Sequence, residues 1–364
     1  MNSPAAAAPG IVAPNTRNLE DLANDMAGWL TARLPGARDV TVSNLSYPLG
    51  AGMSHETILF DAAWRQDGTA RQQGLVVRIK PTRHLVYQDD MFDEQYRLMR
   101  VMHEDGRVKV AHPLWFEPSP ELLGAPFFVM ERLQGRVAVS LPPYAETGWV
   151  ADATPAQRRT LWENSVRQLA AIQTIPVSAA PFLDPADGPH GFDHEWDRWQ
   201  RYLAWLPEDH ATPFLREASG ALDKTRPQGI EPGIVWGDSR LGNVMIDADF
   251  GVVAVMDWEQ TSLGGALHDL GWWLHTERMQ TIGRGLPPLD GMGTHDETRS
   301  LWSEVCGKQT ADIAWYEAFA AFKMACLTRR MMALGAQIAV GRHGIDTPNN
   351  RRMADLLGMS IPAA

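Results

Sequence analysis

The sequence predicts an α+β protein with two lobes, a small β-rich N-lobe followed by a larger, mainly helical C-lobe. The chain has 364 residues, which is more than one hydrophobic core usually holds. Residues 40–80 contain short runs typical of strands, separated by turn signals. Much of residues 154–340 instead repeats its apolar positions at helical spacing. We therefore expect a disordered tail over residues 1–15, a first lobe over 16–130 and a second over 131–364.

The first lobe is predicted to begin with a helix and to continue as strands. Apolar residues recur at helical spacing over residues 19–34, and Pro35-Gly36 would end that helix. Strand-forming runs then cover residues 40–47, 57–64 and 74–80. The turn Gln66-Asp67-Gly68 would join the second strand to the third.

A glycine-containing segment, Gly50-Ala51-Gly52-Met53-Ser54, stands between the first two strands. Backbone N–H groups of such a loop can hold phosphate oxygens, whereas a plain hairpin turn would need no ligand. On the third strand Arg78 and Lys80 share one face, because side chains alternate along a strand. One of these cations should reach the phosphates of a nucleotide held by the loop. The alternative is that both are solvated charges at a sheet edge.

Residues 126–135 form an aromatic-rich segment that follows a predicted helix over residues 89–103. Adenine is flat and apolar with an amide-like edge, so an extended backbone flanked by bulky side chains suits it. The backbone groups of Glu131 and Leu133 would supply that edge. Without a nucleotide, the same run is an aromatic-rich edge strand.

The second lobe is predicted to be mostly helical. Helical patterns cover residues 154–174, 196–206 and 311–340, and Gly335 would break the last of them. Residues 283–293 are rich in Pro and Gly, which is typical of a mobile gating loop or of an inert connection.

The stretch Val235 to Asn243, Val-Trp-Gly-Asp-Ser-Arg-Leu-Gly-Asn, carries the chemistry of the second lobe. Asp238 can accept a hydrogen bond from a substrate hydroxyl, orient it towards a γ-phosphate and take its proton as catalytic base. Arg240 can neutralise charge on the transferring phosphoryl oxygens. Asn243 and Asp257 offer the oxygen ligands that Mg²⁺ prefers. The pattern predicts a kinase that uses ATP and Mg²⁺.

The residues between Asn243 and Asp257 predict a β-hairpin that delivers Asp257 to the site. Apolar residues 244–246 and 252–256 flank the turn-forming residues 247–251. A carboxylate that leaves a buried strand bears a desolvation cost, which a divalent cation offsets. Asp and Asn near Gly are common in structural turns, so it is the hairpin and Asp257 that favour catalysis.

Composition and charge narrow the classes of function. The formal net charge is −11, which argues against nucleic acid or an anionic membrane as partner and favours a small molecule. No apolar run approaches the roughly 20 residues of a spanning helix, and the start lacks the order of a signal peptide. Cys306 and Cys326 are too few for a disulfide framework, so a cytoplasmic location is expected. The histidines form no zinc motif, and Gly52-Met53-Ser54-His55-Glu56 lacks the final glycine of a hydrolase elbow.

These motifs resemble the aminoglycoside phosphotransferase family of the protein-kinase-like superfamily, over about residues 40–340. The branch in question includes the kinase-like domains fused to some acyl-CoA dehydrogenases. The resemblance implies a bilobal protein-kinase-like fold with ATP in the cleft and a small-molecule hydroxyl as acceptor.

The resemblance also implies roles for single residues. The family's metal ligands fall on Asn243 and Asp257, and its usual Asp-Trp-Glu is intact here. Its phosphate-contacting serine falls on Ser54, and its phosphate-binding cation falls on Arg78 in preference to Lys80.

Two positions depart from the family pattern. The catalytic turn usually begins His-Gly-Asp, and Trp236 stands where the histidine is expected. The glutamate that pairs with the phosphate-binding cation falls on Gln95, with Glu94 beside it. The segment 264–271 keeps the family's aspartate that braces the catalytic loop, at Asp269.

The family uses the helical insertion of its second lobe as one wall of the acceptor site, where Trp196, Trp199 and Trp273 are candidates. An aminoglycoside-like acceptor favours an acidic pocket, and a hydroxyacyl or lipid-like acceptor favours basic residues and an apolar trough. The abundant Trp and Met, together with the acyl-CoA dehydrogenase branch, favour the second acceptor.

Two other functions fit parts of the sequence. A nucleotide-binding pseudokinase that acts as a regulator or scaffold is suggested by Trp236 and Gln95, and it is opposed by the intact residues Asp238, Asn243 and Asp257. A protein kinase is disfavoured, because Asp-Trp-Glu replaces Asp-Phe-Gly and no Ala-Pro-Glu follows.

Overall fold

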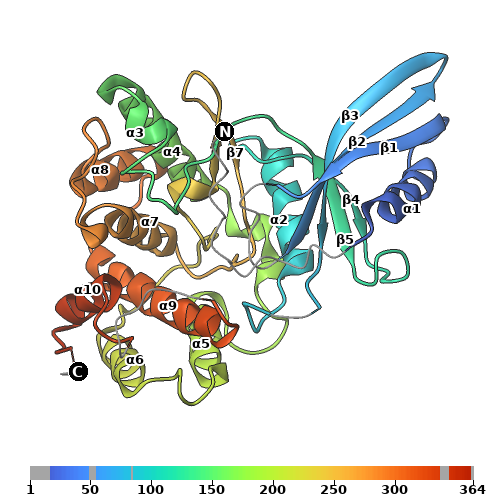
Figure 1. Cartoon of the computed structure of the whole chain (residues 1–364). Helices are drawn as coiled ribbons and strands as arrows, with labels where there is room; N and C mark the ends of the chain where they lie inside the picture. The colour runs from blue at the N-terminus through green and yellow to red at the C-terminus, as the bar shows by residue number, and fades with distance from the viewer. Residues whose placement is uncertain (1–16, 49–54, 83–84, 337–343, 362–364) are drawn as a thin grey trace, which may run out of the picture. The chain divides into compact units, whose positions relative to one another are not determined.

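The computed structural model describes residues 17–48, 55–82, 85–336 and 344–361, and the chain forms two compact units. Of the described residues, the first unit takes those up to 87, together with 111–133 and 334–336, and the second unit takes the rest. The first unit is a β-sheet with a helix, and the second is mainly helical (Figure 1). The predicted α+β class is confirmed.

Within the described residues the first unit contains one five-stranded antiparallel sheet with the strand order β1-β2-β3-β5-β4. The strands are β1 (Arg38–Ser46), β2 (Glu56–Gln66), β3 (Thr69–Ile79), β4 (Pro113–Glu117) and β5 (Phe127–Glu131). Because β5 pairs with β3 on one side and β4 on the other, the alternative of an edge strand at residues 126–135 is wrong. Phe127, Phe128 and Val129 are fully buried in this interior strand.

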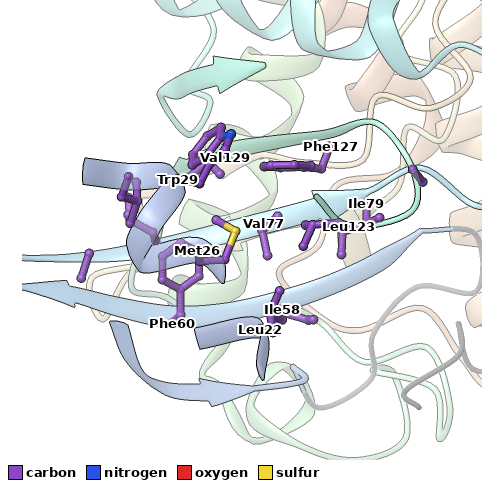
Figure 2. Packing of buried hydrophobic residues seen from close by; sticks show 14 residues of the cluster. Leu22, Met26, Trp29, Ile58, Phe60, Val77, Ile79, Leu123, Phe127 and Val129 are labelled. Atoms are coloured by element: carbon purple, nitrogen blue, oxygen red, sulfur yellow. The ribbon is translucent and has the colours of Figure 1, made fainter. Parts of the chain in front are cut away.

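Helix α1 (Leu19–Thr31) packs on the sheet through one apolar face. Its buried residues Leu22, Met26 and Trp29 recur at helical spacing. Figure 2 shows them beside Phe60, Val77, Phe127 and other residues of β2, β3 and β5. Asn18 caps the helix by accepting from the N–H of Glu20. The helix ends at Thr31, short of the predicted residue 34, because Pro35 has no N–H to donate to the carbonyl oxygen of Thr31.

The hairpin between β2 and β3 has the predicted two-residue turn. Gln66 pairs with Thr69, and the intervening Asp67 and Gly68 have φ of 51° and 77°, as a tight hairpin turn requires. Strand β3 begins at Thr69 rather than at residue 74. The first residues of β3 are exposed, and main-chain pairing with β2 holds them in the sheet. Because they lack alternating apolar residues, the sequence pattern did not mark them as a strand.

The described residues of the second unit form helices and the hairpin of β6 and β7 (Figure 1). Its helices are α2 (Phe92–Asp105), α3 (Trp149–Asp152), α4 (Pro155–Ile172), α5 (Gly191–Trp205), α6 (Pro213–Thr225), α7 (Leu267–Gln280), α8 (His295–Cys306), α9 (Ile313–Ala333) and α10 (Pro348–Leu357). Short 3₁₀ helices are η1 (Val177–Ala179), η2 (Pro181–Leu183), η3 (Leu241–Asn243) and η4 (Ile282–Arg284). The hairpin pairs β6 (Val244–Ile246) with β7 (Val252–Val255).

The three predicted helices of the second lobe correspond to α4, α5 and α9. Helix α9 ends at Ala333, and Gly335 follows it with φ of 94°, a value that a right-handed helix does not allow. This helix packs against α5, α6, α7 and α10, and most of its residues from Ile313 to Cys326 are buried. Burial on all sides makes α9 the centre of the second unit.

Two predicted segments lie outside the described residues, namely the tail over residues 1–15 and the loop Gly50–Ser54. Across the described ranges no helix is both long enough and apolar enough to cross a membrane.

Candidate active site

The predicted catalytic turn connects Val235 to η3. Val235 and Ser262 exchange backbone hydrogen bonds of 2.9 and 3.4 Å, which fixes the start of the turn. Gly237 has φ of 97°, and a Cβ at this position would lie 2.4 Å from the Cβ of Gln260. Only glycine meets both conditions. The turn therefore presents the next residue, Asp238, with its side chain 16% exposed.

Three N–H donors hold the carboxylate of Asp238. Its Oδ1 accepts from Nε1 of Trp272 at 2.9 Å. Its Oδ2 accepts from Nδ2 of Asn243 at 2.7 Å and from Nε of Arg240 at 2.9 Å. An ionised carboxylate offers about four acceptor positions. The three bonds fix its plane and leave capacity on Oδ1 for one more donor, such as a substrate hydroxyl.

Arg240 lies at the edge of this turn with its side chain 34% exposed. Besides its bond to Asp238, its Nη1 donates to Oγ of Ser140 at 3.0 Å. The neighbours of Ser140 are the exposed apolar residues Val139 and Leu141, with exposed fractions of 55% and 73%. The guanidinium is therefore anchored at two points beside an apolar stretch of chain.

The predicted hairpin is confirmed, and it brings Asn243 and Asp257 to the same end. Val244 lies opposite Val255, and the N–H of Met256 donates to the carbonyl oxygen of Asn243 at 2.9 Å. Asp257 directly follows Met256 and has φ of 65°. A non-glycine residue in this left-handed region is held there by its surroundings, which is common at functional sites.

The side chains at this end of the hairpin fit a magnesium ion. The amide nitrogen of Asn243 donates to Oδ2 of Asp238 and to its carbonyl oxygen at 2.9 Å, so the amide oxygen is directed away from that carboxylate. This oxygen and the half-buried carboxylate of Asp257 are hard donors of the kind that Mg²⁺ takes from proteins. The described residues contain no cluster of three His, Cys, Asp or Glu suited to a metal. Phosphate and water oxygens would have to complete the coordination.

Trp236, which replaces the expected histidine, forms part of the same support. Its Nε1 donates to the carbonyl oxygen of Met256 at 2.7 Å, next to Asp257. Its ring packs against that of Trp258 at a centroid distance of 5.9 Å. The indole therefore supplies an N–H donor beneath the turn, as a histidine also can.

Asp269 braces the catalytic turn from the first turn of α7. Its carboxylate oxygens accept from the N–H groups of Trp236 and Gly237 at 2.7 and 2.8 Å, and its carbonyl oxygen accepts from Oγ of Ser239 at 2.7 Å. Burial raises the pKa of Asp269 to about 6, against the lowering effect of the two backbone donors. The carboxylate is thus mostly ionised at neutral pH.

The predicted nucleotide-binding residues that the structure describes belong to the first unit. Ser54 lies outside the described residues. Arg78 is a half-buried residue of the interior strand β3, and its Nη2 lies 3.0 Å from Nδ1 of His55. Lys80 follows the end of β3, with its backbone N–H donating to the carbonyl oxygen of Pro126. For Arg78 the alternative of a charge at a sheet edge is therefore wrong, because β3 is an interior strand.

The predicted hinge residues follow the same strand pairing. The N–H of Glu131 donates to the carbonyl oxygen of His112 at 3.0 Å, and Oε1 of Glu131 accepts from the N–H of His112. Because that N–H serves the sheet, the group that Glu131 can offer to a base is its carbonyl oxygen. Leu133 lies just beyond the end of β5.

Gln95, at the position of the family's glutamate, is a fully buried residue of α2 in the second unit. Its side-chain amide makes no hydrogen bond within the part of the chain that is described. The neighbouring Glu94 is half-buried, and burial raises its pKa.

Sequence reasoning missed Trp272, the donor to Oδ1 of Asp238. The tryptophans that it named, as candidates for the wall of the acceptor site, were Trp196, Trp199 and Trp273, and these are buried core residues. A signal for Trp272 was present, because it stands three positions after Asp269 on a helix and therefore on the same face.

Comparison with known proteins identifies a family for the chain. The model of the phosphotransferase enzyme family matches residues 54–301. Among curated proteins, acyl-CoA dehydrogenase family member 11 of Pongo abelii is 24% identical over 314 residues. The match covers 82% of this chain and 38% of that protein, so the chain spans little more than a third of the relative's length.

Solved structures share the fold. A Ralstonia eutropha protein assigned as an aminoglycoside phosphotransferase has a TM-score of 0.64 and 23% identity, covering 92% of this chain and 95% of that one. A thermostable aminoglycoside phosphotransferase in ternary complex with AMP-PNP and hygromycin B has a TM-score of 0.50 and 14% identity, covering 87% and 100%. The predicted bilobal, kinase-like fold is therefore confirmed, and with the family match over more than half of its length the chain belongs to the phosphotransferase enzyme family.

Proposed function

We propose that the protein transfers the γ-phosphoryl group of ATP to a hydroxyl group of a small molecule, with Asp238 as the catalytic base. The observation that carries this proposal is the carboxylate of Asp238, which three N–H donors orient and which retains capacity on Oδ1. Asn243 and Asp257 stand at one end of the hairpin beside it. This is the arrangement that phosphoryl transfer needs, in which positioning and charge supply most of the catalysis.

Asp238 would accept a hydrogen bond from the acceptor hydroxyl and take its proton as the new O–P bond forms. Arg240, anchored to Asp238 and Ser140, would place its positive charge against the phosphoryl oxygens. Asn243 and Asp257 would hold Mg²⁺, which when bound offsets the charge of the β- and γ-phosphates.

Residues of the first unit would bind the remainder of ATP. Arg78 or Lys80 would contact the α- and β-phosphates, and Ser54 would belong to the loop over them. The carbonyl oxygen of Glu131 and the backbone of Leu133 would recognise the adenine edge. The AMP-PNP complex of the structural relative supports the choice of ATP.

The acceptor is proposed to be a hydroxyacyl or lipid-like molecule in preference to an aminoglycoside. Val139 and Leu141 expose apolar side chains on either side of Ser140, which itself contacts Arg240. Exposed apolar residues beside a reactive group favour an apolar ligand. The name of the relative, an acyl-CoA dehydrogenase family member, supports the same class.

The test is ATP consumption by the purified protein with and without Mg²⁺, across hydroxyacyl and aminoglycoside acceptors. Asp238→Asn should lower kcat by about a thousandfold while nucleotide binding is kept. The matched control is Asp249→Asn, which removes a carboxylate charge from the exposed turn of the nearby β6–β7 hairpin and should leave kcat unchanged. Equal activity of Asp238→Asn and the wild type would refute the proposal.

The second candidate is a nucleotide-binding regulator without turnover. Gln95 favours it, since a neutral buried amide stands where the family carries the glutamate partner of its cation. ATP binding by the wild type without phosphate transfer to any acceptor would support this function.

A further inference from the structure

A buried charged cluster surrounds Lys323 in the centre of the second unit. Lys323 of α9 is fully buried, and its Nζ donates to Nε2 of His268 at 2.6 Å. Oε1 of Glu195 lies 4.0 Å from the same Nζ and accepts from Nε1 of Trp199 at 2.8 Å. A buried ammonium is costly unless it is paired. These contacts show how the cost is met, but the proposed reaction assigns the cluster no role.

Among the ionisable groups of the cluster, Lys323 is the one that titrates near neutral pH. Burial acts to raise the pKa of Glu195, but the charges of Arg198 and Lys323 and the N–H of Trp199 act to lower it and keep the carboxylate ionised. Burial and the charge of Lys323 lower the pKa of His268 to about 3, so the imidazole is neutral and its Nε2 can accept. Burial lowers the pKa of Lys323 to about 8. The ammonium therefore prevails at neutral pH and is lost just above it.

The ammonium of Lys323 is also in contact with aromatic rings. Its Nζ lies 4.8 Å from the ring centroid of Trp272, 4.9 Å from that of Trp199 and 5.8 Å from that of Phe319. Cation–π attraction is strongest with tryptophan and in sites without water. The indole of Trp272 is therefore held in place by a charge that water does not screen.

The edge of the same indole contacts the proposed catalytic base. Nε1 of Trp272 donates to Oδ1 of Asp238 at 2.9 Å, and Oδ1 is the oxygen with remaining acceptor capacity. A cation at the face of an indole draws electron density from it and makes its N–H a stronger donor. One ring thus connects the buried ammonium to the oxygen that would receive the substrate hydroxyl.

We propose that Lys323 is a positioning residue for Asp238, which it orients through the indole ring of Trp272. The effect on catalysis rests on the proposed function. The contacts that join Lys323, Trp272 and Asp238 are present in the folded protein whatever its function. The competing explanation is that Lys323 only balances the charge of Glu195. In that case the loss of Lys323 would change the free energy of unfolding but not the orientation of Asp238.

The first test observes the coupling without turnover, by NMR of ¹⁵N-labelled indole groups in the full chain. The Trp272 indole signal is the one absent in Trp272→Phe. It should shift with pH with a midpoint near 8, and the shift should be absent in Lys323→Met. The groups that face Lys323 are Glu195 and Arg198 of α5, His268 and Asp269 of α7, and Asp238 of the catalytic turn. The pKa values of Glu195, His268 and Asp269 all lie below that of Lys323, so these three groups titrate at lower pH.

The second test measures turnover by a double-mutant cycle. Lys323→Met and Trp272→Phe should each lower kcat by about tenfold with the KM for ATP unchanged, because each weakens a hydrogen bond to a charged group. The double variant should lose no more than the larger single loss, since both act through one ring. Arg330→Met is the control, because it removes another cation from α9, one that lies 3.8 Å over Trp205, and should leave kcat unchanged.

The proposal would be overturned if the losses of kcat in the double-mutant cycle were additive. It would also be overturned if the Trp272 indole signal shifted neither with pH near 8 nor in Lys323→Met. If Lys323→Met does not fold, the pH response of the wild-type signal decides alone. A wild type that binds ATP and never transfers phosphate would refute the proposed function, and the indole signal would still test the coupling.

Discussion

Nε1 of Trp236 donates to the carbonyl oxygen of Met256 at 2.7 Å, which joins the start of the catalytic turn to the end of the β6–β7 hairpin. Trp236, which stands in place of the expected histidine, therefore connects the catalytic turn that carries Asp238 to the chain segment that carries Asp257.

Trp236→Phe should raise the Mg²⁺ concentration needed for activity while lowering the free energy of unfolding only slightly. The ring that packs on Trp258 is kept, but the donor to Met256 is lost, at a cost of about 1 kcal/mol in the free energy of unfolding. Support beside a metal ligand often changes metal affinity by about tenfold, so the Mg²⁺ concentration for half-maximal activity should rise by that factor. Trp258→Phe is the control, because its indole donates to Val255 instead. An unchanged Mg²⁺ response in Trp236→Phe would contradict the prediction.

Protonation of Asp269 should lower activity below about pH 6. Burial raises its pKa to about 6 from the ordinary 3.8, and the proton weakens the bonds from Trp236 and Gly237 that hold the turn. The effect on stability has the opposite sign. Because the folded state binds the proton more tightly, this group's contribution is fully present below the ordinary pKa and is lost as the pH rises through about 6.

The measurement for Asp269 is kcat and the free energy of unfolding from about pH 5 to about pH 7.5. Asp269→Asn should lower kcat at pH 7.5 and should lack the loss of activity below pH 6 that the wild type shows. If the wild type and Asp269→Asn lost kcat in the same way below pH 6, the loss would come from another group.

Gly237→Ala should destabilise the protein by about 2 kcal/mol or more and abolish activity. The added Cβ would meet Gln260 at 2.4 Å while the backbone keeps φ of 97°. Gly220→Ala is the matched control in α6, where a Cβ meets nothing within 4 Å, and it should stabilise by about 0.5–1 kcal/mol. Chemical denaturation of both variants checks the pair. Equal effects would show that the turn tolerates a side chain.

Leu141→Ser should raise the KM for an apolar acceptor by about tenfold and leave the KM for ATP unchanged. Leu141 is 73% exposed beside Ser140, so its loss costs the fold little. Leu85→Ser, at another exposed apolar residue, should leave both constants unchanged. An equal KM for an apolar acceptor in Leu141→Ser and the wild type would argue against an acyl chain at this surface.

Local patterns in the sequence were sufficient for much of the fold and for the core of the site. The hairpin follows from two apolar runs and a turn, and its register alone brings Asn243 and Asp257 together. The β2–β3 turn follows from Asp67-Gly68, whose left-handed conformations those residues tolerate. Short-range geometry sets these features, so a sequence can specify them without knowledge of the rest of the chain.

Long-range packing decided the remainder. The sequence placed β5 at an edge as one alternative, and only pairing with β3 and β4 shows it to be interior. Trp272 and Lys323 read as ordinary helical residues, since periodicity marks a buried face but not the partner that the face meets. Residue type and local spacing were enough to predict which groups could perform the chemistry, because both can be read along the chain. The groups that support them could not be predicted in this way, because their contacts depend on how α5, α7 and α9 pack together.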